Sequence, residues 1–419
     1  MTKNKAIILG VGSKYEMFKH QINNDFEVVG LSDNDKSKQG SKIDGFSVLP
    51  VEEAIKLSFD VAIVTPYKGW GDDLVEQLKL LGVDDFRILR TAELAPFLIE
   101  PLFFKENLTP FEKRILVKNN VETIYLESNS KCNRKCWHCP NSLYDRFSNN
   151  ISMSLELLEK VCNELSEIDY SGYIGFSLYN EPLLDKELLY KISMVKKKLP
   201  RAHTQVITNG DFLCSEKLQE LESAGLDLLI NSIYLNENNS NSWAYKNALG
   251  AILKKSEEIN LPVNILTVDN SVSAGAFGKY KNCDVVFNCV NFNMSSVNRG
   301  RLLENVIPSV EREVVCSHPY QCITISYNGL VTHCTNCYIE ANEHNDYVVG
   351  NATNESIYDI FTSEKYTKIR KKILSDVNEL PCTGCSSNFT SLMPTLINGP
   401  YLPRPRENRH KFEYLVRGF

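Results

Sequence analysis

The feature that most constrains this chain is a short loop with three cysteines. Cys132, Cys136 and Cys139 follow one another at C-x3-C-x2-C spacing. Thiolates are the usual protein ligands of iron–sulfur clusters, and three of them leave one iron of a four-iron cluster open to a ligand that is not protein. A structural zinc site needs a closed set of four ligands, and His138, the candidate for the fourth, lies inside the short spacer before Cys139. Because incidental cysteines rarely cluster so closely, we expect a metal site with one open position.

Composition limits the setting in which such a site would work. The 419 residues suggest two to three domains, and 43% hydrophobic residues are enough to build their cores. The formal net charge of −6 argues against nucleic acid as the main partner. Most of the 13 cysteines stand in close spacings, which favours metal binding over a disulfide framework. Neither a signal peptide nor a run of roughly 20 apolar residues is visible, so we expect a cytoplasmic protein without a membrane partner.

The three-cysteine loop resembles the signature of the radical S-adenosylmethionine (radical SAM) superfamily. The resemblance implies that S-adenosylmethionine binds the open iron through its methionine moiety. It also implies that an electron, delivered by a flavodoxin- or ferredoxin-type reductant, cleaves the cofactor to a 5′-deoxyadenosyl radical, which takes a hydrogen atom from a substrate carbon. Trp137 would pack beside the cluster and near the adenine, with a plain core aromatic as the alternative.

The segment from residue 121 to residue 310 alternates strand patterns with helix patterns. Strands are predicted at 122–126, 173–179, 204–208, 228–233, 263–268 and 285–287, and helices at 153–168, 186–198, 216–224 and 241–258. About six βα units predict an open, partial (β/α)6 TIM-like barrel, in which working residues lie at the carboxyl ends of the strands. The resemblance to the radical SAM core covers this whole segment.

Three residues at these strand ends match motifs of the same superfamily. Asn180-Glu181-Pro182 resembles its "GGEP" stretch, with Asn180 in place of the usual glycine, and implies that Glu181 binds the amino group of the cofactor; a helix N-terminal acid is the alternative. Thr208-Asn209-Gly210 resembles "TNG" and implies that Asn209 contacts the ribose or carboxylate, whereas the alternative is a generic turn pair. Ser232 matches the serine of the fourth-strand motif and implies a further cofactor contact, unless it only satisfies a strand end.

Residues 311–419 contain a second group of cysteines. Cys316 and Cys334 are 18 positions apart, and Cys382 and Cys385 form a C-x2-C pair. These four thiolates are enough to close a four-iron cluster, and zinc bound by the same four is the alternative. The pattern resembles the auxiliary-cluster domain called SPASM, or its shortened twitch form, on the residues Cys316, Pro319, Asn328, Gly329, Val331, Cys334, Gly350, Asn351, Ile357, Ile360, Phe361, Cys382 and Cys385.

The number of auxiliary clusters follows from the end of this pattern. The longer SPASM form has further cysteines after the C-x2-C pair, and no cysteine follows Cys385. The resemblance therefore implies one auxiliary [4Fe–4S] cluster, which would accept the electron left after hydrogen abstraction or tune the site. Cys322 and Cys337 stay open as spare or alternative ligands. We interpret four further cysteines as plain buried thiols: Cys162, Cys214, Cys283 and Cys289.

A candidate substrate residue precedes the second group of cysteines. Arg299, in Asn298-Arg299-Gly300-Arg301, stands 17 residues before Cys316. A similar motif precedes the auxiliary domain in relatives, and in twitch-type alcohol oxidisers an arginine here lies near the substrate. Because an arginine is almost always charged, the resemblance favours substrate orientation over a base role. A surface loop arginine is the alternative.

The N-terminal segment, residues 1–95, has a different pattern. Strand 5–9 ends in Gly10-Val11-Gly12, and strand 26–33 ends at Asp33, 21 residues after Gly12. Helices at 52–56 and 72–81 alternate with strands at 60–65 and 86–89, which predicts a parallel, doubly wound sheet. The spacing is near that of a Rossmann fingerprint, in which the acid meets a ribose hydroxyl, but Tyr15 stands where the third glycine belongs.

This segment resembles the small Rossmann-like domain of sugar-modifying acyltransferases, on Gly30-Leu31-Ser32-Asp33-Asn34-Asp35, Gly40, Gly45 and Val48-Leu49. The resemblance implies a nucleotide or nucleotide-sugar site that includes Gly10, Gly12 and Asp33. A docking or oligomerisation domain without a ligand is the alternative, because a fold does not fix a function. Residues 96–120 are predicted to be a linker with a short helix.

Together these patterns predict a radical SAM enzyme that abstracts hydrogen from a carbinol carbon of a sugar-like or cyclitol-like substrate, free or nucleotide-linked. Oxidation, epimerisation or dehydration would follow. The alternative is the same chemistry on a peptide, in the maturation of a ribosomal peptide or in a sulfatase-maturase-like enzyme. A third reading is an iron–sulfur scaffold or sensor, but it gives Glu181 and Asn209 no reason to lie at strand ends.

Overall fold

The computed structural model describes residues 4–12, 15, 19, 22, 23, 26–66, 70–84, 87–90, 101–235, 243–266, 272–309, 316, 318–375, 382 and 384–386. The chain divides between residues 100 and 101 into two compact units. Residues 101–120, predicted as a linker, fall in the second unit, where they form the 3-10 helix η2 (Pro101–Phe104) and the helix α4 (Pro110–Asn120). Thr109 caps α4 by accepting a hydrogen bond from the backbone N–H of Glu112.

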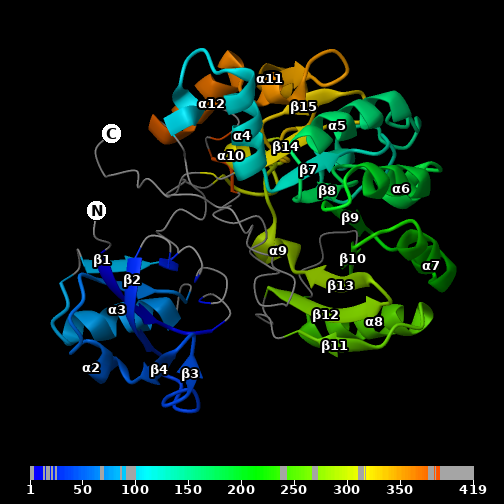
Figure 1. Cartoon of the computed structure of the whole chain (residues 1–419). Helices are drawn as coiled ribbons and strands as arrows, with labels where there is room; N and C mark the ends of the chain where they lie inside the picture. The colour runs from blue at the N-terminus through cyan, green and yellow to red at the C-terminus, as the bar shows by residue number, and fades with distance from the viewer. Residues whose placement is uncertain are drawn as a thin grey trace. The chain divides into compact units, whose positions relative to one another are not determined.

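The first unit is built on a six-stranded sheet with the order β3-β4-β2-β1-β5-β6 (Figure 1). Five strands are parallel and β3 pairs antiparallel with β4; the strands are β1 (Asn4–Leu9), β2 (Phe26–Ser32), β3 (Lys42–Ile43), β4 (Phe46–Leu49), β5 (Val61–Val64) and β6 (Ile88–Arg90). The described helices are α2 (Val51–Ala54) and α3 (Trp70–Leu80). The predicted parallel sheet is therefore confirmed.

Both faces of this sheet are buried. Ile7 and Leu9 of β1 belong to a core that also contains apolar side chains of α2 and α3, whereas Ala6 and Ile8 belong to a second core with Tyr15. Successive side chains of a strand point to opposite faces, so a strand that is buried on both sides has an uninterrupted apolar sequence. This is the reason why Ala6–Leu9 reads as a continuous apolar run.

The second unit is organised by a ten-stranded sheet with the order β11-β12-β13-β10-β9-β8-β7-β14-β15-β16. The strands from β13 to β14 in this order are parallel, and the two pairs of outer strands are antiparallel. The central strands are β7 (Thr123–Leu126), β8 (Tyr173–Gly175), β9 (His203–Thr208), β10 (Leu228–Ile233), β13 (Cys283–Val290) and β14 (Cys322–Ile325). The outer strands are β11 (Val263–Ile265), β12 (Ser273–Tyr280), β15 (Leu330–Thr332) and β16 (Val348–Asn351).

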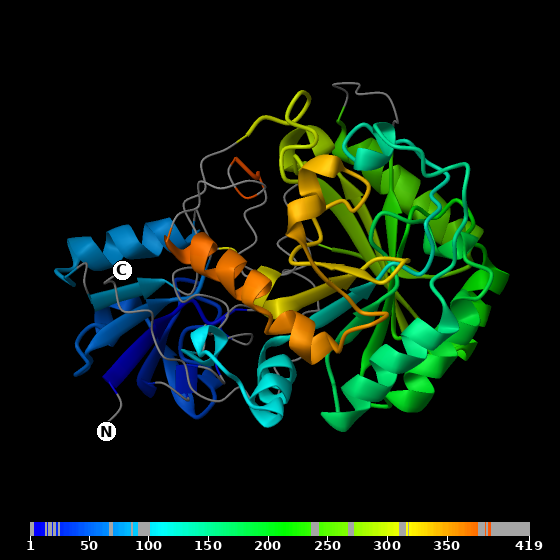
Figure 2. The ribbon, with the colours of Figure 1, turned by 90° about the horizontal axis from the view of Figure 1, so that it is seen from above.

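Helices predicted between these strands are present and cover one face of the sheet (Figures 1 and 2). They are α5 (Leu155–Glu167), α6 (Leu188–Lys198), α7 (Ser215–Ser223) and α8 (Tyr245–Glu258). Ser154 is the N-cap of α5, since its hydroxyl accepts a hydrogen bond from the backbone N–H of Leu157. The α/β class is confirmed, whereas closure into a partial barrel stays a prediction.

The strands after α8 do not continue the predicted series of six βα units. Residues 263–265 form β11, an antiparallel edge strand, and β13 takes the place beside β10. The strand between them, β12, was not predicted because it contains Gly275 and Gly278, which weaken a strand pattern. A Cβ at Gly278 would stand 2.9 Å from the side chain of Leu261, so this position needs glycine for close packing.

The predicted C-terminal domain shares the sheet of the second unit. β14 pairs in parallel with β7, and its hairpin with β15 turns at Gly329 with a φ of 87°. The helix predicted over 356–373 is two helices, α11 (Ile357–Phe361) and α12 (Glu364–Ser375). The loop that contains Arg299 lies between two four-residue helices, α9 (Phe292–Ser295) and α10 (His318–Gln321). Within the described residues, no helix has the length and apolar character that crossing a bilayer requires.

One buried arginine joins four elements of the second unit. Arg370 of α12 is 0% exposed, and its guanidinium lies 4.0 to 5.8 Å from the ring centres of Phe103, Tyr320, Phe361 and Tyr366. Its Nε donates to the carbonyl of Pro319 at 2.8 Å, and its Nη1 donates to that of Phe361 at 2.6 Å. Ring faces and carbonyl oxygens therefore stabilise this charge, although burial lowers the pKa of Arg370 to about 10.

We expect Arg370→Met to lower the free energy of unfolding by about 3 kcal/mol, because it leaves two buried carbonyls without their donor and removes the cation from the rings. Urea denaturation under anaerobic conditions measures the change. Lys365→Met, at an exposed position of the same helix, is the control and should have little effect. Equal losses for the two variants would contradict a special role of Arg370.

Candidate active site

A cavity of about 370 Å³ lies at the carboxyl ends of the parallel strands of the second unit. Its lining includes the last residues of β9, β10 and β13 together with the loop that follows β7. Seven of the residues predicted to act in the site line it: Cys132, Cys136, Cys139, Glu181, Asn209, Ser232 and Arg299. The topology thus gathers residues that are far apart in the sequence, as expected for strand ends of a parallel sheet.

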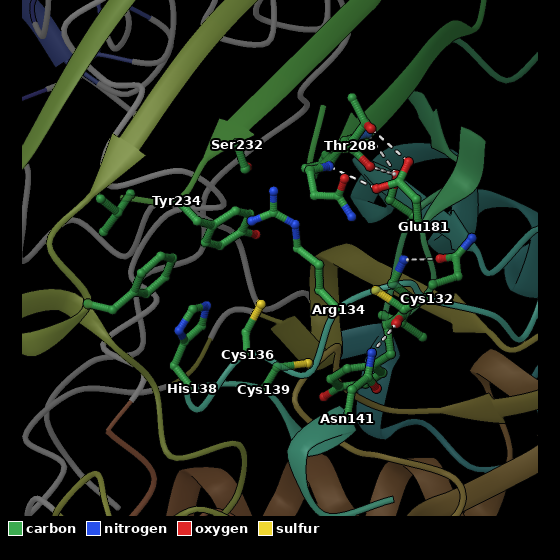
Figure 3. Close-up of a pocket in the computed structure, with 18 of the residues that line it drawn as sticks. Cys132, Arg134, Cys136, His138, Cys139, Asn141, Glu181, Thr208, Ser232 and Tyr234 are labelled. Atoms are coloured by element: carbon green, nitrogen blue, oxygen red, sulfur yellow. Dashed lines mark hydrogen bonds between the residues drawn. The ribbon is translucent and has the colours of Figure 1, made fainter. Parts of the chain in front are cut away.

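The three-cysteine loop presents its thiols to this cavity. The sulfur atoms of Cys132, Cys136 and Cys139 face a common space, with His138 on one side and Glu181 on the other (Figure 3). All three are free thiols, and burial raises the pKa of Cys132 to about 11 and also raises that of Cys139. Binding to a metal cluster deprotonates such thiols. Three convergent thiols therefore fit a cluster with one open iron.

A buried arginine that the sequence analysis did not single out holds the loop. Arg146 is 2% exposed; its Nη1 donates to Glu127 Oε1 at 3.1 Å and to the carbonyl of Ser130 at 2.9 Å. Its Nε donates to Glu340 Oε2 at 2.8 Å, and its own carbonyl accepts from the N–H of Cys132 at 3.1 Å. Arg146 therefore connects the end of β7, the cysteine loop and the C-terminal segment.

Glu181 is buried and already has three hydrogen-bond donors. Its Oε1 accepts from Thr208 Oγ1 at 2.7 Å and from the N–H of Leu183 at 3.0 Å, while its Oε2 accepts from the N–H of Asn209 at 2.8 Å. It is thus an N-terminal cap of the 3-10 helix η4 (Pro182–Leu184) as well as a cavity residue. Burial raises the pKa of Glu181, and the three hydrogen bonds oppose that shift. Contact with a cofactor amino group stays a prediction.

Asn209 is engaged with the cysteine loop. Its Nδ2 donates to Asn133 Oδ1 at 2.8 Å, and its Oδ1 accepts from the N–H of Asp211 at 3.0 Å. Asp211 also accepts from Asn133 Nδ2 at 2.6 Å and forms an ion pair with Arg134. We call Asn133, Arg134, Asn209 and Asp211 the loop latch. The amide of Asn209 is therefore used within the protein, and its predicted contact with the ribose or carboxylate stays untested.

Of the two ring residues in the cysteine loop, His138 lines the cavity, whereas the place of Trp137 beside the cluster stays a prediction. The ring of His138 stacks on Phe292 with a centroid distance of 3.6 Å and an interplanar angle of 7°, and Tyr234 lies 5.7 Å away. Trp137 meets His138 edge-on at 5.4 Å and is absent from the described lining of the cavity. Burial lowers the pKa of His138 to about 3, so the ring is neutral at neutral pH.

Two further lining residues were missed by the sequence analysis. Asn288 of β13 is the register partner of Ser232 on β10, so the two side chains stand on the same face at neighbouring strand ends. Tyr234 follows the strand end that carries Ser232, and its ring lies beside that of His138. Asn288 could have been found from its place near the end of a strand. It was missed because that strand was predicted only over 285–287, and β13 extends to Val290.

Arg299 reaches the cavity from the loop before the second cysteine group. Its Nη1 donates to Asn336 Oδ1 at 3.0 Å, and its guanidinium lies 5.9 Å from the ring centre of Tyr179. Its Nε is buried and has no hydrogen-bond partner among the described residues. Arg299 is thus a lining residue of the cavity, and its predicted orienting role stays a prediction.

The second cysteine group also comes together in space. Burial raises the pKa of the Cys334 thiol, and the nearby thiols of Cys316, Cys385 and Cys382 raise it further. The same four thiols act on Cys337, whose N–H donates to the carbonyl of Cys334 at 3.1 Å. The four predicted thiols thus fit an auxiliary cluster, and Cys337 lies beside them. Across the described residues, no three Cys, His, Asp or Glu side chains converge as ligands of a single metal ion.

The four cysteines interpreted as buried thiols are not alike. Cys162, Cys283 and Cys289 are buried, as predicted. Cys214 is exposed, so its interpretation was wrong. Its sulfur accepts a hydrogen bond from the N–H of Lys217 at 3.5 Å and caps α7, which explains why it stands at the helix end instead of in the core.

In the first unit, the carboxylate of Asp33 is hydrogen-bonded to the glycine turn that follows β1. It is 8% exposed; its Oδ2 accepts from the N–H of Val11 and from Lys38 Nζ, both at 2.9 Å, and its Oδ1 accepts from the N–H of Asp35 at 2.9 Å. Gly10 has a φ of 87°, and a Cβ on it would overlap Pro66; Gly12 faces Lys38. The carboxylate is thus already paired, and a nucleotide contact through Gly10, Gly12 or Asp33 stays a prediction.

Comparison with known proteins finds three domain families along the chain. Residues 126–236 match the radical SAM superfamily, residues 316–386 match the SPASM iron–sulfur cluster-binding domain, and residues 2–89 match the C2185-like N-terminal family. A curated relative is the S-adenosyl-L-methionine-dependent 2-deoxy-scyllo-inosamine dehydrogenase of Niallia circulans, 29% identical over 250 residues, which are 60% of this chain and 86% of the relative.

Solved structures give matches over a similar part of the chain. A crystal structure of BtrN in complex with AdoMet and 2-DOIA is 25% identical, covers 64% of this chain and 94% of its own, and has a TM-score of 0.47. A structure of anSMEcpe with bound AdoMet and Cp18Cys peptide is 14% identical, covers 60% and 82%, and has a TM-score of 0.36.

We expect Arg146→Met to lower the free energy of unfolding by about 3 to 5 kcal/mol, because it leaves Glu127 buried without its cation. Burial already raises the pKa of Glu127, and loss of the arginine raises it further. A carboxyl with a raised folded-state pKa destabilises the fold more as the pH rises through that pKa. The loss should therefore grow as the pH rises above about 4.5, the ordinary pKa of a glutamate. Arg114→Met, which breaks an exposed pair with Glu167, is the control; a pH-independent loss in Arg146→Met would contradict this reasoning.

The two matched domains coincide with the two groups of thiols that the structure brings together. The chain therefore carries a radical SAM domain and a SPASM iron–sulfur domain, and the protein is a radical SAM enzyme that uses a [4Fe–4S] cluster, S-adenosylmethionine and an auxiliary cluster.

Proposed function

We propose that this enzyme oxidises a secondary alcohol of a sugar-like or cyclitol-like substrate to a ketone. The observation that carries the proposal is the cavity itself, which has three thiols and the charged Arg299 among its lining residues. The curated relative that is a dehydrogenase of 2-deoxy-scyllo-inosamine supports a substrate of this kind.

The donor sets fit the two clusters. Cys132, Cys136 and Cys139 would hold the first, and the second would be held by Cys316, Cys334, Cys382 and Cys385. When bound, the cofactors supply a hydrogen-abstracting radical and an acceptor for the electron that remains on the substrate. In the net reaction the alcohol loses a hydrogen atom from carbon, a proton from its hydroxyl and one electron.

The residues of the chain would bind and orient the substrate. The guanidinium of Arg299 lines the cavity, so N–H groups other than the Nη1 that donates to Asn336 can donate to a substrate oxygen. Because a guanidinium offers hydrogen-bond donors and no acceptor, Arg299 suits orientation of the substrate better than a base role. Ser232 and Asn288 add polar groups on the neighbouring strands β10 and β13, and the neutral ring of His138 adds an aromatic wall. This mixture suits a small polyol with many hydroxyls.

Epimerisation and dehydration begin with the same hydrogen abstraction and are the rival outcomes. Epimerisation returns a hydrogen atom to the substrate, so its net reaction releases no electron. The group of thiols beside Arg299 favours oxidation, because only oxidation needs an electron acceptor. We assign no ligand to the first unit, since Asp33 already accepts three hydrogen bonds within the protein.

Isotope transfer tests the substrate class. With anaerobic enzyme, S-adenosylmethionine and reductant, a panel of cyclitols, sugars and nucleotide sugars deuterated at the carbinol carbons should contain one that transfers deuterium into 5′-deoxyadenosine. Mass spectrometry should find one ketone for each labelled 5′-deoxyadenosine. Release of label without a ketone would favour epimerisation or dehydration. Turnover only with peptide substrates would overturn the proposal.

Iron counting tests the two donor sets. Reconstituted wild-type protein should hold about eight irons per chain, and the variants Cys136→Ala and Cys382→Ala about four each. Only Cys136→Ala should lose formation of 5′-deoxyadenosine, because the open iron belongs to the first cluster. Cys162→Ala, at a buried thiol outside both groups, is the control and should keep all its iron. About four irons in the wild type would contradict an auxiliary cluster.

A further inference from the structure

The loop that carries Arg299 has an unusual backbone. Arg299, Gly300 and Arg301 have φ values of 51°, 60° and 74°. Side chains other than glycine rarely adopt this left-handed conformation, and a run of three persists only where the surroundings hold it in place. Such strain is common at functional sites, and it directs attention to the contacts that hold this loop.

Two of these contacts fix the backbone of the loop. Asn298 is 0% exposed; its Nδ2 donates to the carbonyl of Gly384 at 2.7 Å, and its N–H donates to Ser386 Oγ at 2.8 Å. His344 Nδ1 accepts from the N–H of Tyr338 at 2.9 Å, so the ring proton belongs on Nε2, which lies 3.1 Å from the carbonyl of Gly300 and donates to it. Both anchors come from segments that also carry the auxiliary thiols.

The third contact fixes the side chain. Asn336 lies between Cys334 and Cys337, and it is 3% exposed. Its backbone N–H donates to the sulfur of Cys334 at 3.3 Å, and its Oδ1 accepts from Arg299 Nη1 at 3.0 Å. Its Nδ2 is buried and has no partner among the described residues, so only the oxygen of this amide is used within the described chain. One residue therefore touches both a proposed cluster ligand and the proposed substrate arginine.

We propose that Asn336 is a positioning residue, which holds the guanidinium of Arg299 in the cavity and makes its orientation depend on the folded auxiliary thiol loop. The inference rests on the proposed function insofar as Arg299 meets the substrate. A charge-assisted hydrogen bond from a buried amide restricts the long arginine side chain to one orientation. The assembled Cys334–Cys337 loop thus becomes a condition for correct substrate binding, in addition to holding the cluster.

Two substitutions separate the hydrogen bond from the shape of the side chain. Asn336→Leu keeps the size but removes the acceptor, and it should raise KM for the alcohol about tenfold or more. Asn336→Asp keeps an acceptor oxygen toward Arg299 and should restore KM to near the wild-type value. S-adenosylmethionine binding, followed by the change it causes in the EPR spectrum of the reduced first cluster, should be the same in all. Asn354→Leu, at an exposed asparagine of the same segment, is the matched control.

A double-mutant cycle tests whether Asn336 acts through Arg299. Arg299→Met should raise KM by itself, and adding Asn336→Leu should then have little further effect, because the partner of the amide is already gone. Independent, additive effects would overturn the positioning role. So would an Asn336→Leu enzyme with the KM of the wild type.

A measurement without substrate separates this inference from the proposed function. Phenylglyoxal modifies accessible arginines. The folded protein is modified under anaerobic conditions and then digested, and mass spectrometry of the peptides reports the extent of modification at each arginine. Asn336→Leu should speed modification of Arg299 several-fold and leave Arg301, which pairs with Glu304, unchanged. An unchanged rate at Arg299 would refute the positioning role. If the rate does respond but the wild type oxidises no polyol, the proposed function fails and the positioning role stands.

Discussion

The ion pair between Arg146 and Glu127 is the interaction on which the catalytic face depends. Both side chains are almost fully buried, and an unpaired charge in such a place costs several kcal/mol. Glu127 directly follows β7, the strand that precedes the cysteine loop. The carbonyl of Arg146 accepts a hydrogen bond from Cys132, and its guanidinium also contacts Glu340 in the C-terminal segment. The first thiol group is therefore not free to move independently of the segment that carries the second.

The ten-stranded sheet also links the segments that carry the two groups of thiols, because both segments contribute strands to it. Because β14 pairs with β7, the first strand of the β14–β15 hairpin that leads to Cys334 lies directly beside the strand that leads to Cys132. The loop with Arg299 is anchored to residues of the auxiliary segment and still lines the cavity of the radical SAM domain. The auxiliary segment thus helps to position a residue that lines this cavity. A radical enzyme benefits from such rigidity, because a loosely held substrate permits side reactions of the radical.

Much of the site was predictable because a parallel sheet has a simple rule: residues that follow strands meet at one edge. This rule brought Glu181, Asn209, Ser232 and the cysteine loop to one cavity. It did not reveal which neighbour in the cysteine loop would turn inward. His138 faces the cavity because its ring stacks on Phe292, a residue from a distant helix. Nor did it show that the amide of Asn209 forms its hydrogen bonds within the loop latch.

The sequence by itself determined the features that depend on neighbouring residues: the spacing of metal-binding thiols, the helices α5 to α8, and the apolar runs of the central strands. These follow from local geometry, since a few residues suffice to form a cluster loop or to show a helical or strand period. Only the tertiary structure decided the antiparallel edge after α8, the pairing of Arg146 with Glu127, and the contact of Asn336 with Arg299. Each of these joins segments far apart in the chain, and burial selects such partners from the whole fold, so no local pattern records them.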